Sequence, residues 1–379
     1  MSFSFGFSAD SDDEFTAPTT QTRPFTDPLS HINPDARPAT LESFQSILHS
    51  LKDVRTTFEA YTTPKGNLVY RRELFDVKHQ LMMEENDDQS SDEFKILIGD
   101  DATDLKKNVY EGGLKSWECS VDTVDKLSEL SDEELLSGDV IELGCGTALP
   151  STYLFKRALM QQKREQKLTF VLADYNSSVL RLVTLPNLII TWASLLDDED
   201  RTSLQRSEDD TIPIVADELQ FTEALLTKFF DSVKMQNINI ELISGAWSRQ
   251  FVTLTNQIST SFKLIITSET IYAPETLPII SELVIELIQQ NKGSMALVAA
   301  KDIYFGVGGS LVEFQNYLEE RQQHGVKIEF EVQKVNAGLK RSMFSSSDVL
   351  QYVTIKMLFL HLSRRMSVIF ILVSNTGYI

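Results

Sequence analysis

The sequence has few cysteines, few histidines and little positive charge for a chain of 379 residues. Its two cysteines, Cys119 and Cys145, exclude a disulfide framework or a cysteine-rich zinc site, and they fit a reducing compartment. The five histidines are scattered without the spacing of metal ligands, so we expect no metal. No basic-then-apolar signal sequence opens the chain, which predicts a cytoplasmic and nuclear protein.

Positively charged residues are outnumbered by negatively charged ones. Lysine and arginine number 35 against 55 aspartate and glutamate residues, which gives a formal net charge of −20. We therefore expect no direct binding of nucleic acids, because phosphates are bound mainly by lysine and arginine. The same charge favours basic protein partners such as ribosomal proteins or histones through long-range attraction. Solubility alone is the simpler explanation for most of the acidic residues.

Long apolar runs are also missing. The two apolar segments near the C-terminus, Tyr352–Leu362 and Val368–Val373, are shorter than the roughly 18 residues that a membrane-spanning helix needs. Joining them would place Arg364 and Arg365 within the span, at a cost of about 2.5–3.5 kcal/mol each. We therefore expect no membrane anchor. An apolar tail docked on the sheet and an error in the predicted gene both stay open as explanations.

The most informative stretch is Asp139–Pro150, DVIELGCGTALP. It predicts a buried strand that turns through Gly144 and Gly146 into a helix, which gathers backbone N–H groups where a nucleotide can bind. A dinucleotide fingerprint would need a small residue in place of Leu149, and a P-loop would need Gly-Lys-Ser/Thr after the glycines. What remains is acidic-x-Gly-x-Gly, the nucleoside loop of S-adenosylmethionine-dependent methyltransferases, with Ala148 replacing its third glycine.

Strands and helices alternate along the rest of the chain, which predicts a doubly wound α/β sheet. Further strands are expected at Leu168–Ala173, Ile238–Ile243, Phe262–Ser268, Met295–Ala300 and Lys327–Val335. Helices are expected at Leu41–Phe58, Val121–Leu130, Pro150–Met160, Leu277–Ile288 and Leu311–Arg321, with Leu188–Trp192 in a helical or irregular segment. We divide the chain into a disordered acidic tail (1–40), a helical accessory extension (41–109), the methyltransferase domain (110–344) and an atypical apolar tail (345–379).

Chemically useful side chains follow the predicted strands. Asp174 ends the second strand, where a carboxylate can accept hydrogen bonds from both ribose hydroxyls, although it could instead cap the helix after it. After the third strand, Gly245 would leave space for adenine and Trp247 would flank it. Glu269 follows the fourth strand at the edge where open α/β sheets bind substrates. Trp117 is either a core residue or part of a lid over the sulfonium, worth about 0.5–2 kcal/mol.

From about Leu51 to Phe344 the chain resembles the protein-histidine N-methyltransferases of the seven-stranded, class I superfamily. The matching segments include YEGGLKSWEC, IELGCGTALP, DYNSSVLRLVTLPN, SGAW, SETIY and KDIYFGVGGS, and the opening MSFSFGF resembles fungal members. The resemblance implies S-adenosylmethionine as donor and S-adenosylhomocysteine as product. It also implies that the acceptor is a histidine of a basic large-subunit ribosomal protein (the third by standard naming), with a role in ribosome biogenesis and translation. We expect a monomer.

The resemblance further implies which residues contact the cofactor. They are Lys115, Ser116, Trp117, Glu118, Cys119, Gly144, Gly146, Asp174, Tyr175, Asn176, Gly245, Ala246, Trp247 and Ser268. Glu269 with Tyr272 resembles the acidic-x-x-aromatic element at the substrate edge of related protein methyltransferases. The family normally continues past GLKR into a closing apolar strand, which the residues after about Phe344 do not match. The seventh strand is therefore left unassigned.

Methylation of an imidazole needs no strong base, because a neutral imidazole already carries a free lone pair at pH 7. We assign Glu269 to orient the imidazole through a hydrogen bond and Tyr272 to wall the pocket, while Glu269 could instead cap the next segment. Two other functions stay open. One is a lysine methyltransferase of the same superfamily, and the other is a non-catalytic binding factor for a basic ribosomal protein.

The ribose assignment predicts the effect of one substitution. Asp174→Ala should abolish cofactor binding while the protein still folds, because the carboxylate would accept charged hydrogen bonds worth on the order of 1.5–3 kcal/mol each. Calorimetric titration with S-adenosylhomocysteine measures this, and unchanged binding would show the assignment to be wrong.

Overall fold

The computed structural model describes residues 25–31, 33–83, 112–206, 213–301, 304, 308–337, 353–362 and 366–375. The opening MSFSFGF segment and the GLKR segment at 338–341 lie outside these ranges. So do the predicted boundaries at residues 110 and 344, which therefore stay predictions.

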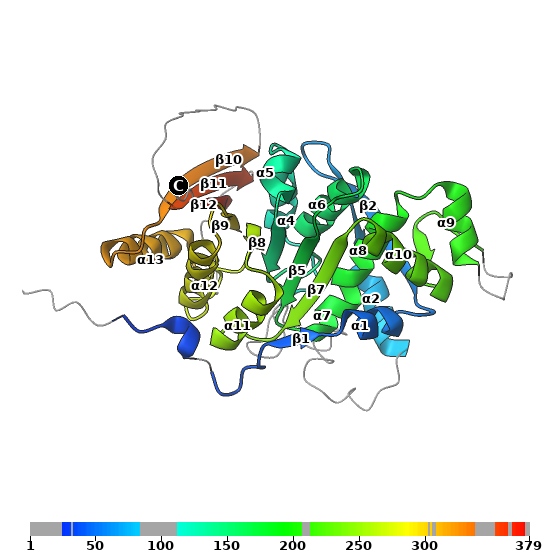
Figure 1. Cartoon of the computed structure of the whole chain (residues 1–379), viewed down its shortest axis with the longest axis horizontal. Helices are drawn as coiled ribbons and strands as arrows, with labels where there is room; N and C mark the ends of the chain where they lie inside the picture. The colour runs from blue at the N-terminus through cyan, green and yellow to red at the C-terminus, as the bar shows by residue number, and fades with distance from the viewer. Residues whose placement is uncertain are drawn as a thin grey trace, which may run out of the picture.

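The core of the protein is a nine-stranded sheet with the order β1-β7-β5-β4-β8-β9-β12-β10-β11 (Figure 1). Its strands are β1 (Thr40–Glu42), β4 (Asp139–Leu143), β5 (Leu168–Asp174), β7 (Ile238–Ser244), β8 (Phe262–Ser268), β9 (Met295–Lys301), β10 (Glu329–Ala337), β11 (Val353–Leu362) and β12 (Met366–Asn375). Strands β7, β5, β4, β8 and β9 run parallel, and β1 joins β7 antiparallel. The predicted doubly wound, class I α/β fold is confirmed.

Helices cover both faces of this sheet (Figure 1). One core contains residues of α4 (Glu118–Leu127), α5 (Asp132–Leu136), α6 (Leu149–Met160), α8 (Leu185–Ala193) and α10 (Glu223–Met235). The other contains residues of α11 (Arg249–Ile258), α12 (Leu277–Gln290) and α13 (Leu311–Gln323). Successive strand residues point to opposite faces. Phe170 and Leu172 therefore enter the first core, and Val171 and Ala173 enter the second.

The described residues contain other helices besides these two groups. They are η1 (Pro28–Ser30), α1 (Phe44–Ser50), α2 (Leu74–Met83), α7 (Ser177–Val179), the π-helical turn η3 (Leu180–Thr184) and α9 (Asp198–Gln205). The segment Leu188–Trp192, rich in β-branched residues, is helical as predicted and lies in α8. Among the described residues, no helix combines the length and the apolar character needed to cross a membrane.

The C-terminal tail supplies the closing strand that the sequence left unassigned. β12 lies between β9 and β10 and is antiparallel to both, with Val368–Ser374 paired along β9. β11 pairs parallel with β10 and antiparallel with β12. Of the two explanations offered for the apolar tail, the structure agrees with a tail docked on the sheet, because both apolar runs form strands that belong to it.

The helix predicted over Leu41–Phe58 is wrong at both ends, because Leu41 and Glu42 belong to β1 and α1 does not extend beyond Ser50. α1 ends there, and the chain continues into β2 (Arg55–Thr62), which pairs with β3 (Leu68–Arg72) and β6 (Glu218–Gln220) in a separate sheet. Asp53 has a φ of 66°, a left-handed conformation that cannot continue an α-helix, and its N–H donates to the Phe221 carbonyl at 2.9 Å. The accessory extension is consequently a mixture of strands and helices.

The disorder predicted through residue 40 is wrong for its last part. Leu29 and Ala39 are buried in the core beside α12, and the Asp27 carboxylate pairs with Arg249 at 2.6 Å. Figure 1 shows this blue segment passing along the lower edge of the sheet to β1. Its polar composition resembles that of a tail, but two apolar residues and one ion pair fix it in place. We call residues 25–40 the N-terminal segment.

Glu142, the acid of the acidic-x-Gly-x-Gly motif, lies in the middle of the sheet. The residue is 1 % exposed, its Oε2 accepts a hydrogen bond from the Ser151 N–H at 3.0 Å, and its Oε1 has no hydrogen-bond partner. Burial raises the pKa of Glu142 to about 8, against the opposing effect of the Ser151 hydrogen bonds. A protonated Glu142 thus joins β4 to the start of α6 and holds the glycine turn between them.

Glu142→Gln should stabilise the protein in a pH-dependent way. Between the ordinary pKa of 4.5 and the folded value of about 8, the Glu142 carboxyl is ionised only in the unfolded chain. The free energy of unfolding therefore falls as the pH rises through this window. Glutamine keeps the acceptor for Ser151 and cannot ionise. We expect a gain of roughly 3–5 kcal/mol at pH 8 that vanishes near pH 4.5, measured by urea unfolding of both proteins. A gain independent of pH would contradict this.

Candidate active site

A cavity of about 290 Å³ opens at the carboxyl ends of β4, β5, β7 and β8. The chain order of the strands reverses between β4 and β8, and crevices at such a switch point are where open α/β sheets bind ligands. Of the predicted site residues, those that line it are Lys115, Trp117, Gly144, Gly146, Asp174, Tyr175, Gly245, Ala246, Trp247, Ser268, Glu269 and Tyr272. The structure therefore brings most of the predicted positions to one place.

Four predicted residues support the cavity without lining it. The Ser116 hydroxyl lies 2.9 Å from the Thr147 hydroxyl, and Asn176 is fully buried with its N–H donating to Asp174 Oδ1 at 3.1 Å. The Cys119 N–H donates to Glu269 Oε1 at 3.4 Å. The Glu118 carboxylate accepts a hydrogen bond from Lys301. Each of these four residues thus contacts another residue near the cavity and does not itself line the cavity.

Two residues of the glycine turn, Gly144 and Gly146, have no side chains, and their conformations need this. Gly144 and Gly146 have φ angles of 64° and 51°, and a Cβ on Gly144 would lie 2.6 Å from Thr270 Cγ2. Ala148, which replaces the third glycine, also adopts a left-handed φ of 52°. Such a conformation costs an L-residue about 1–2 kcal/mol, so the turn is maintained by its surroundings.

Asp174 holds this turn in shape. Its Oδ2 accepts a hydrogen bond from the Gly146 N–H at 2.9 Å, and its Oδ1 accepts one from the Asn176 N–H at 3.1 Å. Asn176, not Asp174, occupies the N-cap position of α7. The carboxylate lines the cavity while it supports the turn, so Asp174→Asn tests the ribose role more sharply than alanine, because asparagine keeps one acceptor.

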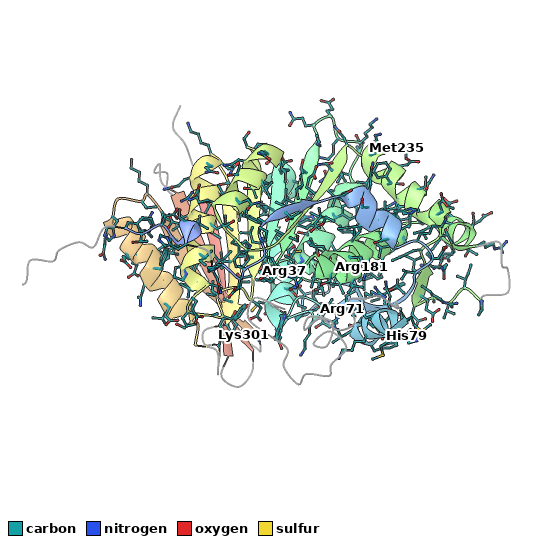
Figure 2. All side chains as sticks on the ribbon, turned by 90° about the horizontal axis from the view of Figure 1, so that it is seen from below. Arg37, Arg71, His79, Arg181, Met235 and Lys301 are labelled. Atoms are coloured by element: carbon teal, nitrogen blue, oxygen red, sulfur yellow. The ribbon has the colours of Figure 1, made fainter. Side chains whose placement is uncertain are left out.

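Gly245 makes room for the backbone of the N-terminal segment. Its φ is 98°, and a Cβ there would lie 2.3 Å from the Pro38 carbonyl oxygen. The missing side chain therefore admits the backbone of the N-terminal segment, whereas we had expected it to leave space for adenine. The neighbouring Ala246 N–H donates to the Arg37 carbonyl at 2.8 Å. Figure 2 labels Arg37 in the view of the molecule from below.

Trp117 lies between two cations. The ammonium groups of Lys115 and Lys301 are 5.3 and 5.6 Å from its ring centroid, and its indole N–H donates to the Gly112 carbonyl at 3.2 Å. Both distances fall in the range of cation–π attraction. Trp117 is partly exposed and lines the cavity, so the core interpretation is wrong, while its role as a lid over the sulfonium stays a prediction.

Glu269 provides a buried carboxylate at the end of β8. Its side chain is 7 % exposed, and its Oε1 lies 3.4 Å from Lys301 Nζ as well as from the Cys119 nitrogen. Its φ of 58° is rare for a residue with a side chain and is typical of a functional constraint. The capping alternative named the next segment, whereas Glu269 accepts the N–H of Cys119 in the first turn of the distant helix α4.

Groups beside Glu269 stay protonated at neutral pH. Burial raises the pKa of the Cys119 thiol and of the Tyr304 hydroxyl well above their ordinary values, and the charge of Glu269 adds to both shifts. The Tyr304 ring lies edge-on to the Tyr272 ring at 6.3 Å. Tyr272 and Tyr304 therefore form an aromatic corner next to the carboxylate.

Several residues that line the cavity were not predicted from the sequence. Other residues that line the cavity are His31, Asn33, Ala36, Gly112, Gly113, Ser120, Cys145, Thr147, Thr270, Glu275, Thr276 and Ile279. The first three belong to the N-terminal segment, whose polar composition carried no signal for a site. Gly112 and Gly113 belong to the YEGGLKSWEC segment and could have been included on that ground.

Curated relatives resemble the chain over most of its length, although no family model matches it. Histidine protein methyltransferase 1 of Saccharomyces cerevisiae is 47 % identical over 373 residues, which covers 90 % of this chain and 97 % of that protein. Its namesake in Schizosaccharomyces pombe is 35 % identical over 292 residues, or 76 % and 80 % of the two chains. The chain belongs to the histidine protein methyltransferase family. It is an S-adenosylmethionine-dependent methyltransferase.

Solved structures resemble this methyltransferase only weakly. The N-methyltransferase NodS of Bradyrhizobium japonicum WM9, in complex with S-adenosylhomocysteine, has a TM-score of 0.33 at 10 % identity, covering 79 % of this chain and 99 % of that one. A class I methyltransferase of Listeria monocytogenes, described as putative, has a TM-score of 0.34 at 10 % identity, covering 79 % of each chain. Similarity at this level supports no inference about the site.

The cavity of this methyltransferase fits S-adenosylmethionine, which supplies an activated methyl group on a sulfonium. The turn at Gly144 and Gly146 lines the cavity and packs too closely against Thr270 and Gly113 to admit a Cβ without a shift. The Asp174 carboxylate, the predicted ribose ligand, lines the cavity beside it, and Trp247 lies in the same wall. The described residues contain no group of three or more His, Cys, Asp or Glu side chains that could hold a metal ion.

Gly245→Ala tests whether the N-terminal segment forms the donor site. The added Cβ would collide with Pro38 and displace the segment, so we expect S-adenosylhomocysteine to bind about 10-fold or more weakly in calorimetry. Gly66→Ala is the matched control, because Gly66 has a similar φ of 87° and nothing within 4 Å of the added atom. The control should keep its affinity. Equal losses in both variants would attribute the effect to backbone strain alone.

Proposed function

We propose that this methyltransferase transfers a methyl group from S-adenosylmethionine to a ring nitrogen of a histidine in a basic large-subunit ribosomal protein, the third by standard naming. The observation that carries the proposal is the Glu269 carboxylate, which is almost fully buried in the wall of the donor cavity and lies beside the Tyr272–Tyr304 corner. The family name supports histidine as the acceptor.

An imidazole suits a site of this kind. When one ring nitrogen carries a proton and donates it in a hydrogen bond to Glu269, the other nitrogen keeps its lone pair for the methyl group. The nitrogen–carbon bond forms as the sulfur–carbon bond breaks, and the positive charge of the sulfonium passes to the imidazole. A fixed carboxylate stabilises that developing charge in the transition state. The remaining N–H proton leaves to water afterwards.

Correct placement of the two reactants would contribute further to the rate of methyl transfer. A one-step displacement needs the nitrogen in line with the sulfur–carbon bond, and holding two reactants in such a geometry is worth several kcal/mol. Tyr272 would pack against the imidazole ring, and Trp117 would cover the donor. The protein then needs no general base, in contrast to a lysine methyltransferase, whose acceptor must first lose a proton.

The partner and the location follow from charge and from the resemblance. The net charge of −20 supports attraction of a basic protein and disfavours direct contact with nucleic acid. We propose that the methyltransferase acts as a monomer in the cytoplasm and nucleus, and that it serves ribosome biogenesis and translation. These points rest on sequence reasoning.

The deciding experiment identifies the methylated amino acid. The protein and labelled S-adenosylmethionine are incubated with ribosomal proteins from cells that lack the enzyme, and the product is hydrolysed in acid. We expect the label in methylhistidine. Asp174→Asn is the matched control and should lower the incorporation, because it removes the charge proposed to hold the ribose.

Other outcomes would overturn parts of the proposal. Label in methyllysine would keep the donor and replace the acceptor. A folded protein that binds S-adenosylhomocysteine but labels no ribosomal protein would contradict the proposed substrate. Tight binding of a basic ribosomal protein without any methyl transfer would favour the non-catalytic binding factor.

A further inference from the structure

We infer that Lys301 is a positioning residue for methyl transfer, which holds the Glu269 carboxylate in its orientation in the cavity wall while Glu118 anchors the other side of the lysine. The inference rests on the proposed function, in which Glu269 contacts the acceptor imidazole. Lys301 itself does not line the cavity. It would therefore act through Glu269, without touching either substrate.

The sheet places Lys301 next to Glu269 although 32 positions separate them in the sequence. β8 and β9 are parallel neighbours in which Ser268 pairs with Ala299, and the Glu269 N–H donates to the Ala299 carbonyl at 2.8 Å. Lys301 is the last residue of β9, two positions further on. Figure 2 labels Lys301 in the view of the molecule from below.

The lysine ammonium lies between two carboxylates. Its Nζ is 2.9 Å from Glu118 Oε2 and 3.4 Å from Glu269 Oε1. Glu118 is 58 % exposed at its side chain, whereas Lys301 and Glu269 are 13 % and 7 % exposed. The contact with Glu269 is thus shielded from water, and the contact with Glu118 is open to it. Shielded charges interact far more strongly than exposed ones.

A buried carboxylate needs such a partner to remain charged. Burial lowers the pKa of Lys301, but the charge of Glu269 and the hydrogen bond to Glu118 outweigh this effect, so the net shift is upward and the ammonium stays charged. The Cys119 N–H contributes a second donor to the same Oε1 from the first turn of α4, where a helix favours negative charge.

Without Lys301, two acidic neighbours would oppose the charge of Glu269 with no cation between them, while the Cys119 N–H would still donate to it. Glu118 and Asp122 are acidic, and Cys119 and Tyr304 are neutral at pH 7 with pKa values raised partly by Glu269 itself. Burial first, and then Asp125 and Glu269, raise the pKa of Asp122 to about 7. Removing the ammonium should therefore let Glu269 take up a proton at a higher pH.

Lys301 also lies 5.6 Å from the Trp117 ring centroid, so a purely structural role in supporting that ring is the alternative. The two roles differ in what a substitution changes. Loss of support for Trp117 would weaken cofactor binding and leave the titration of Glu269 unchanged. Loss of positioning would lower kcat and move the acidic limb of its pH profile.

The test compares Lys301→Met with Lys301→Arg, and Lys263→Met serves as a control. Lys263 lies on the neighbouring β8, where its ammonium donates to the Gly293 carbonyl, outside the cavity wall. We expect Lys301→Met to lower kcat about 30-fold or more and to shift the acidic limb upward by about one pH unit or more, with the Kd for S-adenosylhomocysteine within about 3-fold. Arginine should restore most of kcat, and Lys263→Met should match the wild type.

A second measurement works without any acceptor. The Glu269 carboxyl signal is followed by carbon NMR in glutamate-labelled protein, with Glu269→Gln to assign it, and its pKa should rise by about one unit or more in Lys301→Met. An unchanged pKa would overturn the inference, and so would a kcat loss without a shifted limb. If the wild type methylates no histidine while the NMR shift is present, the proposed function fails and the role of Lys301 in holding Glu269 stands.

Discussion

The hydrogen bond from the Gly146 N–H to the Asp174 carboxylate joins the ends of β4 and β5, and the active site is arranged around it. The adjacent Cys145 N–H donates to the Ala173 carbonyl at 2.8 Å, so two successive backbone donors are fixed to the next strand. Thr184 then donates its hydroxyl to the Gly146 carbonyl at 2.6 Å. These bonds hold a left-handed, glycine-lined turn open beside a carboxylate, as a nucleoside requires.

Contacts from distant parts of the chain reinforce this turn. Asn187 donates its amide to the Thr147 carbonyl at 2.8 Å and accepts the Arg72 N–H at 2.7 Å. The buried Arg72 guanidinium pairs with Asp76 at 2.6 Å, and a charge removed from water in this way is stable only with its partner. The accessory strands β2 and β3 are thereby coupled to the donor site, although they lie outside it.

Sequence reasoning succeeded where a pattern is local and failed where it is not. The strands β5, β7, β8 and β9 were predicted because runs of apolar and β-branched residues are long enough to specify a buried strand. The helix expected over Leu41–Phe58 failed because Asp53 breaks it and the apolar residues beyond serve a strand instead. Gly245 was expected to leave space for adenine, and the group that approaches it, the Pro38 backbone, could not be inferred from its own neighbourhood.

By itself, the sequence determined the doubly wound sheet, the glycine turn with Asp174 and the position of Glu269 after β8, because each depends on residues adjacent in the chain. Only the tertiary structure decided that the N-terminal segment forms part of the cavity wall and that the apolar tail closes the sheet beside β9. It also decided that Lys301 meets Glu269. These contacts join residues far apart in sequence, and they depend on strand order, which no local pattern encodes.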